Sequence, residues 1–86
     1  MRSGNKSACD HKRVLELEQQ GDWEAAHAMV QVHGDALSCE IHGYLHRVEG
    51  DLGNASYWYG RADKRLTSNP LPDEWQRLYA IASATT

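Results

Sequence analysis

Apolar residues recur every three or four positions along most of the chain, and no stretch alternates between apolar and polar residues with a period of two. This spacing predicts amphipathic helices and no strands. From the N-terminus the predicted apolar faces are Ala8, Cys9, Val14 and Leu17; Trp23, Ala26, Met29 and Val30; Leu37, Ile41, Tyr44, Leu45 and Val48; Leu52, Ala55, Tyr59, Ala62 and Leu66; and Trp75, Leu78, Tyr79 and Ala82.

The dipeptide Gly-Asp occurs three times, at residues 21–22, 34–35 and 50–51. Glycine accepts the left-handed conformation that often follows the end of a helix. Aspartate caps the next helix by accepting from its free N–H groups. The three dipeptides therefore predict joints between consecutive helices.

These signals predict an all-α fold of about five helices in one domain spanning residues 1–86. Two antiparallel helical hairpins are followed by a C-terminal capping helix. The turn-forming run TSNPLP separates the second hairpin from this last helix. The predicted boundaries are a flexible N-terminus at 1–7, hairpins at 8–33 and 36–66, a linker at 67–72 and the last helix at 73–83.

Composition narrows the class of partner. The net charge of −3 leaves no basic surplus with which to bind nucleic acid. No apolar run is long enough to cross a membrane, and residues 1–12 lack the apolar core of a secretory signal, so we expect a cytoplasmic protein. Two cysteines are too few for a disulfide framework. A chain of 86 residues is small, and two hairpins leave one end open, so we expect a homodimer or a protein partner.

Two segments are related to each other: GDWEAA at 21–26 and GDLGNA at 50–55 are offset by 50 − 21 = 29 residues. Together with Gly43, placed for close helix contact, they resemble the tetratricopeptide repeat. That resemblance implies right-handed stacking of the hairpins and a role in protein–protein interaction. The offset departs from the repeat length of about 34 residues, and no proline follows Ala62 to end the second unit.

A narrower resemblance covers residues 42–62, HGYLHRVEGDLGNASYWYGRA. This segment resembles a family of uncharacterised proteins that share the pattern His-Arg-x-Glu-Gly-Asp-x-x-Asn-Ala-x-Tyr-Trp. The resemblance implies kinship with that family and no particular activity.

A polar stripe runs beside the apolar face of the predicted helix 36–49. At about 100° per residue, its members fall within roughly 80° of one another: Cys39, His42, His46 and Glu49. The solvent side of this helix is predicted near Glu40 and Arg47. The preceding helix runs antiparallel to it and can add His27 or His33 to the stripe.

Three interpretations of this stripe remain open. Two histidines four residues apart can hold a transition metal such as zinc, with Cys39 as a third ligand beside His42 and His46. A second interpretation is a small-molecule pocket built from the stripe and His27. In the third, the histidines are buried and hydrogen-bonded, and Cys39 packs as a small apolar residue.

A second group lies in the following helix: Asn54, Tyr57, Trp58, Tyr59 and Arg61. Tyr59 belongs to the predicted core. Tyr57, Trp58 and Arg61 are candidates for an interaction surface, because Trp, Tyr and Arg dominate binding hot spots. In the alternative interpretation, Tyr57 and Trp58 cover a seam to the C-terminal helix or to a partner subunit.

No phosphate loop or nucleophile motif is present, so we assign no catalytic residue and lean against an enzyme. The pairs Asp63/Lys64 and Asp73/Glu74 are interpreted as solvated surface. We expect a protein–protein interaction or scaffold module that needs no cofactor. The alternative is a metal- or small-molecule-binding protein that uses the His/Cys/Glu cluster and could be an enzyme.

Overall fold

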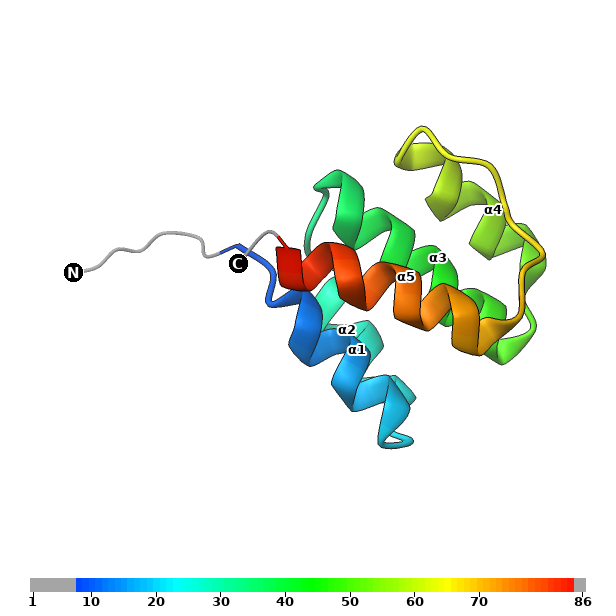
Figure 1. Ribbon diagram of the computed structural model, residues 1–86. Coiled ribbons are helices and arrows are strands. Elements are labelled where there is room, and N and C mark those ends of the chain that lie inside the picture. Colours follow the sequence, from blue (N-terminus) through cyan, green and yellow to red (C-terminus); the bar gives the residue numbers. More distant parts are fainter. Residues whose placement is uncertain (1–7, 85–86) are drawn as a thin grey trace.

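The computed structural model describes residues 8–84, which fold into five helices and no strand (Figure 1). The prediction of an all-α chain with about five helices is confirmed for this range. The helices are α1 (His11–Gln19), α2 (Trp23–Val30), α3 (Ala36–Glu49), α4 (Leu52–Arg61) and α5 (Leu71–Ala84). The flexible N-terminus predicted for residues 1–7 lies outside the described residues.

Each of the first four helices begins after an aspartate whose side chain accepts a hydrogen bond from a backbone N–H three residues later. These caps are Asp10, Asp22, Asp35 and Asp51. Gly21 and Gly50 have φ angles of 91° and 87°, the left-handed conformation predicted for them. Gly34 does not adopt it, because α2 ends at Val30 and a longer connection leads to α3.

The helix α3 is the centre of the fold, since it packs against each of the other four helices. Neighbouring helices pair as predicted, α1 with α2 and α3 with α4. The last helix folds back onto α1 and α3, and it reaches α4 through the hydrogen bond between Glu74 and Tyr59. The helix α5 begins at Leu71, two residues before the predicted start at 73. The helix α4 ends at Arg61, so Leu66, which was predicted to lie on its apolar face, is in the connecting loop with 37% of its surface exposed.

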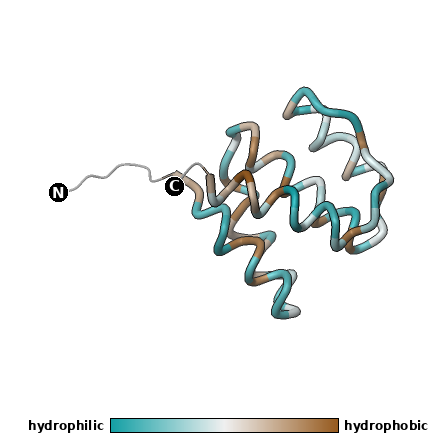
Figure 2. Tube along the Cα trace, in the orientation of Figure 1, coloured by the Kyte–Doolittle hydropathy of each residue, from teal (hydrophilic) through white to brown (hydrophobic). Residues whose placement is uncertain are grey.

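Apolar and polar residues are interspersed along the helices (Figure 2). The apolar residues of α1, α2, α3 and α5 meet in one core, and Ala55 and Tyr59 of α4 are buried outside it. Leu15 is fully buried in this core, although its position was not included in the predicted apolar face of the first helix. The indole N–H of Trp75 donates to the Leu15 carbonyl oxygen at 2.9 Å. This bond between residues 60 positions apart joins the last helix to the first.

The joint between α3 and α4 is tight at Gly43. A Cβ atom at this position would lie 2.8 Å from Tyr59 Cδ2 and 3.0 Å from the Ala55 carbonyl oxygen. The close contact expected at Gly43 is therefore present, and it sets how near α4 approaches the site-bearing helix.

One surface prediction is wrong: Glu74 is completely buried. Its carboxylate accepts from Tyr59 Oη at 2.8 Å, from Asn69 Nδ2 at 3.0 Å and from the Arg77 guanidinium at 2.8 and 2.9 Å. The sequence could not indicate this burial, because the partners come from α4, the loop and α5. No helix among residues 8–84 is long and apolar enough to cross a membrane.

Candidate metal centre

Three of the four residues of the polar stripe of α3 are buried, namely Cys39, His42 and His46, and Glu49 at the end of the helix is exposed. Every residue from Ser38 to His46 is buried. The predicted solvent side was wrong as well: Glu40 is 5% exposed and forms an ion pair with Arg77 at 2.7 Å. Arg47 donates to the side-chain and backbone oxygens of Asn69. The stripe is therefore one polar side of a helix that is covered almost all around.

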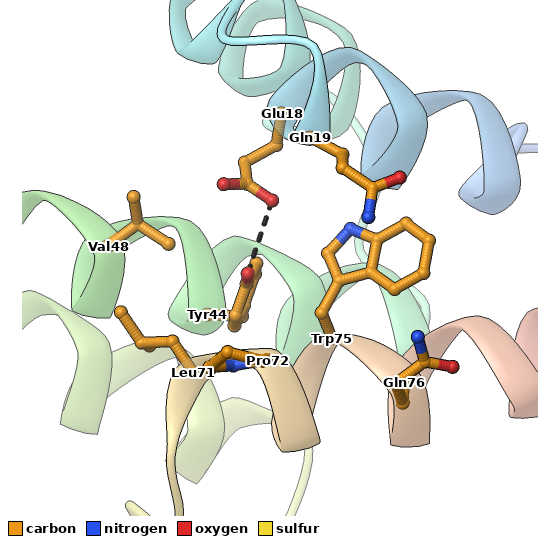
Figure 3. Close-up of a pocket in the computed structure, with 8 residues that line it drawn as sticks. All are labelled: Glu18, Gln19, Tyr44, Val48, Leu71, Pro72, Trp75 and Gln76. Atoms are coloured by element: carbon orange, nitrogen blue, oxygen red, sulfur yellow. Dashed lines mark hydrogen bonds between the residues drawn. The ribbon is translucent and has the colours of Figure 1, made fainter.

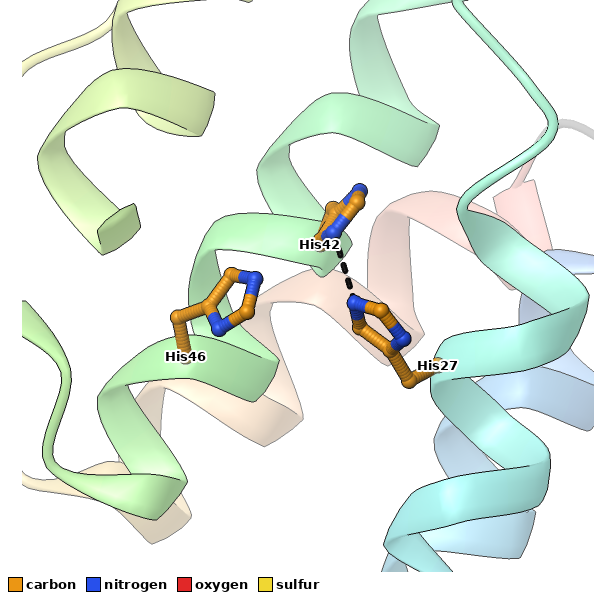
Figure 4. Close-up of side chains that lie close together, drawn as sticks. All are labelled: His27, His42 and His46. Atoms are coloured by element: carbon orange, nitrogen blue, oxygen red, sulfur yellow. Dashed lines mark hydrogen bonds between the residues drawn. The ribbon is translucent and has the colours of Figure 1, made fainter.

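Three histidines converge between α2 and α3, as Figure 4 shows. His42 and His46 occupy successive turns of α3, and His27 reaches toward them from α2. The Nε2 atoms of His27 and His42 are 3.0 Å apart. One ring nitrogen of each histidine lies within 4.8 Å of the other two. His42 and His46 are 3% and 7% exposed, and His27 is half-buried on the outer side of the cluster.

Two tryptophans hold these rings in place. Trp23, one turn before His27 on α2, stacks on that ring with centroids 4.8 Å apart. Trp58 of α4 stacks on His42 at 3.9 Å, so it covers the cluster from the other side. The indole N–H of Trp23 donates to the carbonyl oxygen of Leu45 at 2.7 Å, which fixes this ring against α3. The imidazoles thus have restricted orientations before any ligand arrives.

Glu49 orients the ring of His46. The Nδ1 atom of His46 lies 2.5 Å from Oε1 of Glu49. A carboxylate only accepts hydrogen bonds, so Nδ1 is the donor in this contact. A carboxylate behind a histidine is the arrangement that orients metal-binding imidazoles and increases their basicity.

Burial keeps the other two imidazoles neutral at pH 7. It lowers the pKa of His42 to about 4, with the adjacent rings of His27 and His46 adding to the effect. It also lowers the pKa of His27. Protonation of His42 would place a proton on both ring nitrogens, and Nδ1 has no hydrogen-bond partner. Neutral imidazole is the form that binds metal ions.

The structure brings most of the residues of the predicted site together and leaves Cys39 apart from them. It brings His27, His42 and His46 together and places Glu49 behind His46. Cys39 is 1% exposed and lies outside the three-histidine group; its thiol donates to the Gly34 carbonyl oxygen at 3.7 Å, and burial raises its pKa. His46 and Glu49 also form a second possible group with Asp51 at the end of α3.

The two predicted groups of residues form one region. Trp58 lies on His42, Tyr57 packs edge-on against Trp58, and the Arg61 guanidinium lies 5.1 Å from the centre of the Trp58 ring. Apart from the hydrogen bond between Tyr59 and Glu74, α4 and α5 do not pack against each other within residues 8–84. Tyr57 and Trp58 therefore do not cover a seam between these two helices. Trp23 was the residue that the site prediction missed; its position four residues before His27, on one face of a helix, was the available signal.

Comparison with protein-family models, with curated proteins and with solved structures finds no match to this chain. The interpretation of the site therefore depends on its own chemistry.

Proposed function

We propose that this protein binds one divalent transition-metal ion, with zinc as the first candidate, through His27, His42 and His46. The observation that carries the proposal is the convergence of three ring nitrogens from two helices within 4.8 Å. Imidazole suits zinc, copper, iron and nickel. Since three protein ligands leave a fourth position open, the proposed ion could take a water molecule or a further ligand.

The spacing of the nitrogens supports the proposal. Two ligands at the usual zinc–nitrogen distance in tetrahedral geometry lie about 3.3 Å apart. The Nε2 atoms of His27 and His42 are 3.0 Å apart, so small rotations of the rings suffice for that pair. The His46 nitrogen lies within 4.8 Å of the other two, so it has to approach them by up to about 1.5 Å to reach the same spacing.

The surroundings of the cluster support the same function. Glu49 orients His46, and the stacked rings of Trp23 and Trp58 hold His27 and His42. Neutral His27 and His42 release no net proton on binding, but the ring that donates the hydrogen bond between their Nε2 atoms has to transfer that proton to its Nδ1. His27 is half-buried, so one of the three proposed ligands is partly exposed to solvent.

The test is metal content, measured by mass spectrometry on untagged protein, followed by titration of chelator-treated protein with Zn²⁺ and Co²⁺. We expect one equivalent of metal per chain and visible Co²⁺ absorption of a four-coordinate site. The double variant His42→Ala/His46→Ala should bind neither ion at this stoichiometry.

A matched control is available in His33→Ala. His33 is the same residue type and follows α2, but it lies outside the three-histidine cluster. This variant should keep full metal binding. Metal-free protein that also fails to bind added Zn²⁺ would refute the proposal and leave the cluster as a structural polar network.

Binding of a partner protein is the second candidate function, and one observation favours it. Tyr57 is 55% exposed on α4 beside Trp58 and Arg61, which matches the composition of interface hot spots. We expect self-association through this surface. Sedimentation of wild type and Tyr57→Ala tests it: a wild-type dimer that Tyr57→Ala weakens supports the role, and a monomer at all concentrations refutes it.

A further inference from the structure

A pocket lies between α1, α3 and α5 (Figure 3). Its volume is about 310 Å³, which suits a small organic molecule. Tyr44 contributes to its wall from α3 and lies about 160° around the helix axis from His42. The pocket is therefore on the opposite side of α3 from the histidine cluster, and its function is independent of the proposed metal.

The pocket contains one carboxylate without a cationic partner. Glu18 reaches into it from α1 and accepts a hydrogen bond from Tyr44 Oη at 3.2 Å through Oε1. Across residues 8–84, no Lys, Arg or His side chain forms an ion pair with Glu18. Burial raises the pKa of this carboxyl, because the single neutral donor does not compensate for the loss of water. A positive charge at this point would be stabilised.

The rest of the wall combines aromatic and aliphatic side chains with the amides of Gln19 and Gln76. The Tyr44 hydroxyl meets the carboxylate, Trp75 contributes a second aromatic ring to the wall, and Val48, Leu71 and Pro72 add aliphatic surface (Figure 3). Trp75 is 9% exposed, and its bond to the Leu15 carbonyl oxygen holds the ring in position. Ammonium groups are attracted to the faces of Trp and Tyr, and alkyl chains to the aliphatic surface.

We propose that this pocket binds a small organic cation, namely a protonated alkylamine. Its ammonium group lies against the free oxygen of Glu18 and the aromatic rings, and its carbon chain packs on Val48 and Leu71. An anion of the same size is repelled by Glu18, and a neutral alcohol gains only the apolar contacts.

The test is a titration of the ¹⁵N-labelled full chain, followed by amide chemical shifts, in buffer with EDTA and constant ionic strength. The probes are n-butylammonium chloride, 1-butanol and sodium butyrate. We expect saturable shifts at the C-terminal end of α1, at Tyr44 and Val48, and at the start of α5. Butylammonium should bind at least about fivefold more tightly than 1-butanol, and butyrate should not bind.

Two variants make the test specific. Glu18→Gln keeps an acceptor for the Tyr44 hydroxyl and should lose the preference for the ammonium over the alcohol. Glu24→Gln removes an exposed carboxylate from α2, away from the pocket, and should bind like wild type. Equal binding of butylammonium and 1-butanol by wild type, shifts that do not saturate, or an unchanged preference in Glu18→Gln would each overturn the proposal.

Discussion

Gly43→Ala tests whether the contact between α3 and α4 holds the candidate metal site together. The new Cβ atom would lie 2.8 Å from Tyr59 Cδ2 and 3.0 Å from the Ala55 carbonyl oxygen. Tyr59 cannot rotate away, because it is fully buried and its hydroxyl donates to Glu74. The carbonyl oxygen belongs to the backbone of α4, so the whole helix has to move.

The size of the effect follows from these distances. Relief to 3.4 Å, where ordinary contact begins, requires a displacement of 3.4 − 2.8 = 0.6 Å. A gap of this size forfeits a quarter to a half of the dispersion energy of the contacts that it opens. Overpacking of this kind costs about 1–3 kcal/mol, and the better helix propensity of alanine offsets about 1 kcal/mol. We expect a net loss of up to about 2 kcal/mol relative to wild type, or a Tm lower by up to about 16 °C for a domain of this size.

Urea and thermal unfolding followed by circular dichroism measure this loss. Gly60→Ala is the matched control, since Gly60 lies in α4 with nothing within 4 Å of its added Cβ atom. It should be neutral or slightly stabilising. Because Trp58 moves with α4, Gly43→Ala should also weaken Zn²⁺ binding, whereas Gly60→Ala should not. A Gly43→Ala protein as stable as Gly60→Ala would refute this description of the α3–α4 contact.

Three further predictions concern the carboxylates. Glu49→Gln removes the charge that orients the proposed ligand His46, so Zn²⁺ affinity in a chelator competition should fall about 10- to 100-fold. An unchanged affinity would contradict this orienting role of Glu49. Folding raises the pKa of Glu18, so the contribution of this group to stability is greatest in acid and declines as pH rises through the folded-state pKa. In urea unfolding, Glu18→Gln should therefore be as stable as wild type below about pH 4. At pH 7 it should be more stable than wild type, by less than about 1 kcal/mol. Glu74→Ala removes the buried acceptor of Tyr59 Oη, while Arg77 keeps its ion pair with Glu40; it should cost about 1–3 kcal/mol. The exposed Asp73→Ala control should change thermal stability by less than about 0.5 kcal/mol.

The helices could be predicted because their signals are local. An aspartate cap bonds to a backbone N–H only three residues away, as Asp22 and Asp51 do, and apolar periodicity is a property of neighbouring positions. The position of α5 depends instead on contacts such as the one between Trp75 and Leu15, across 60 residues. No spacing within either helix indicates that such a pair will form.

The same distinction applies to the candidate site. The stripe of His42 and His46 could be found from one helix, and an antiparallel neighbour was enough to suggest His27. Cys39 shares the stripe, but its thiol bonds to the chain before α3 and not to the histidines. The stacking of Trp58 on His42 requires the actual distance between α3 and α4, which depends on the contact at Gly43. Burial of Glu40 likewise requires a partner on α5.

Both proposed sites depend on polar groups that make the small core less stable than an apolar one would be. His42 and His46 are buried where leucine would gain transfer free energy, and the three imidazoles make one hydrogen bond among themselves. Glu18 loses water without gaining a cation. A domain of 86 residues has little stability in reserve, so a metal on one side of α3 and an ammonium ligand on the other would each convert an unfavourable burial into binding energy.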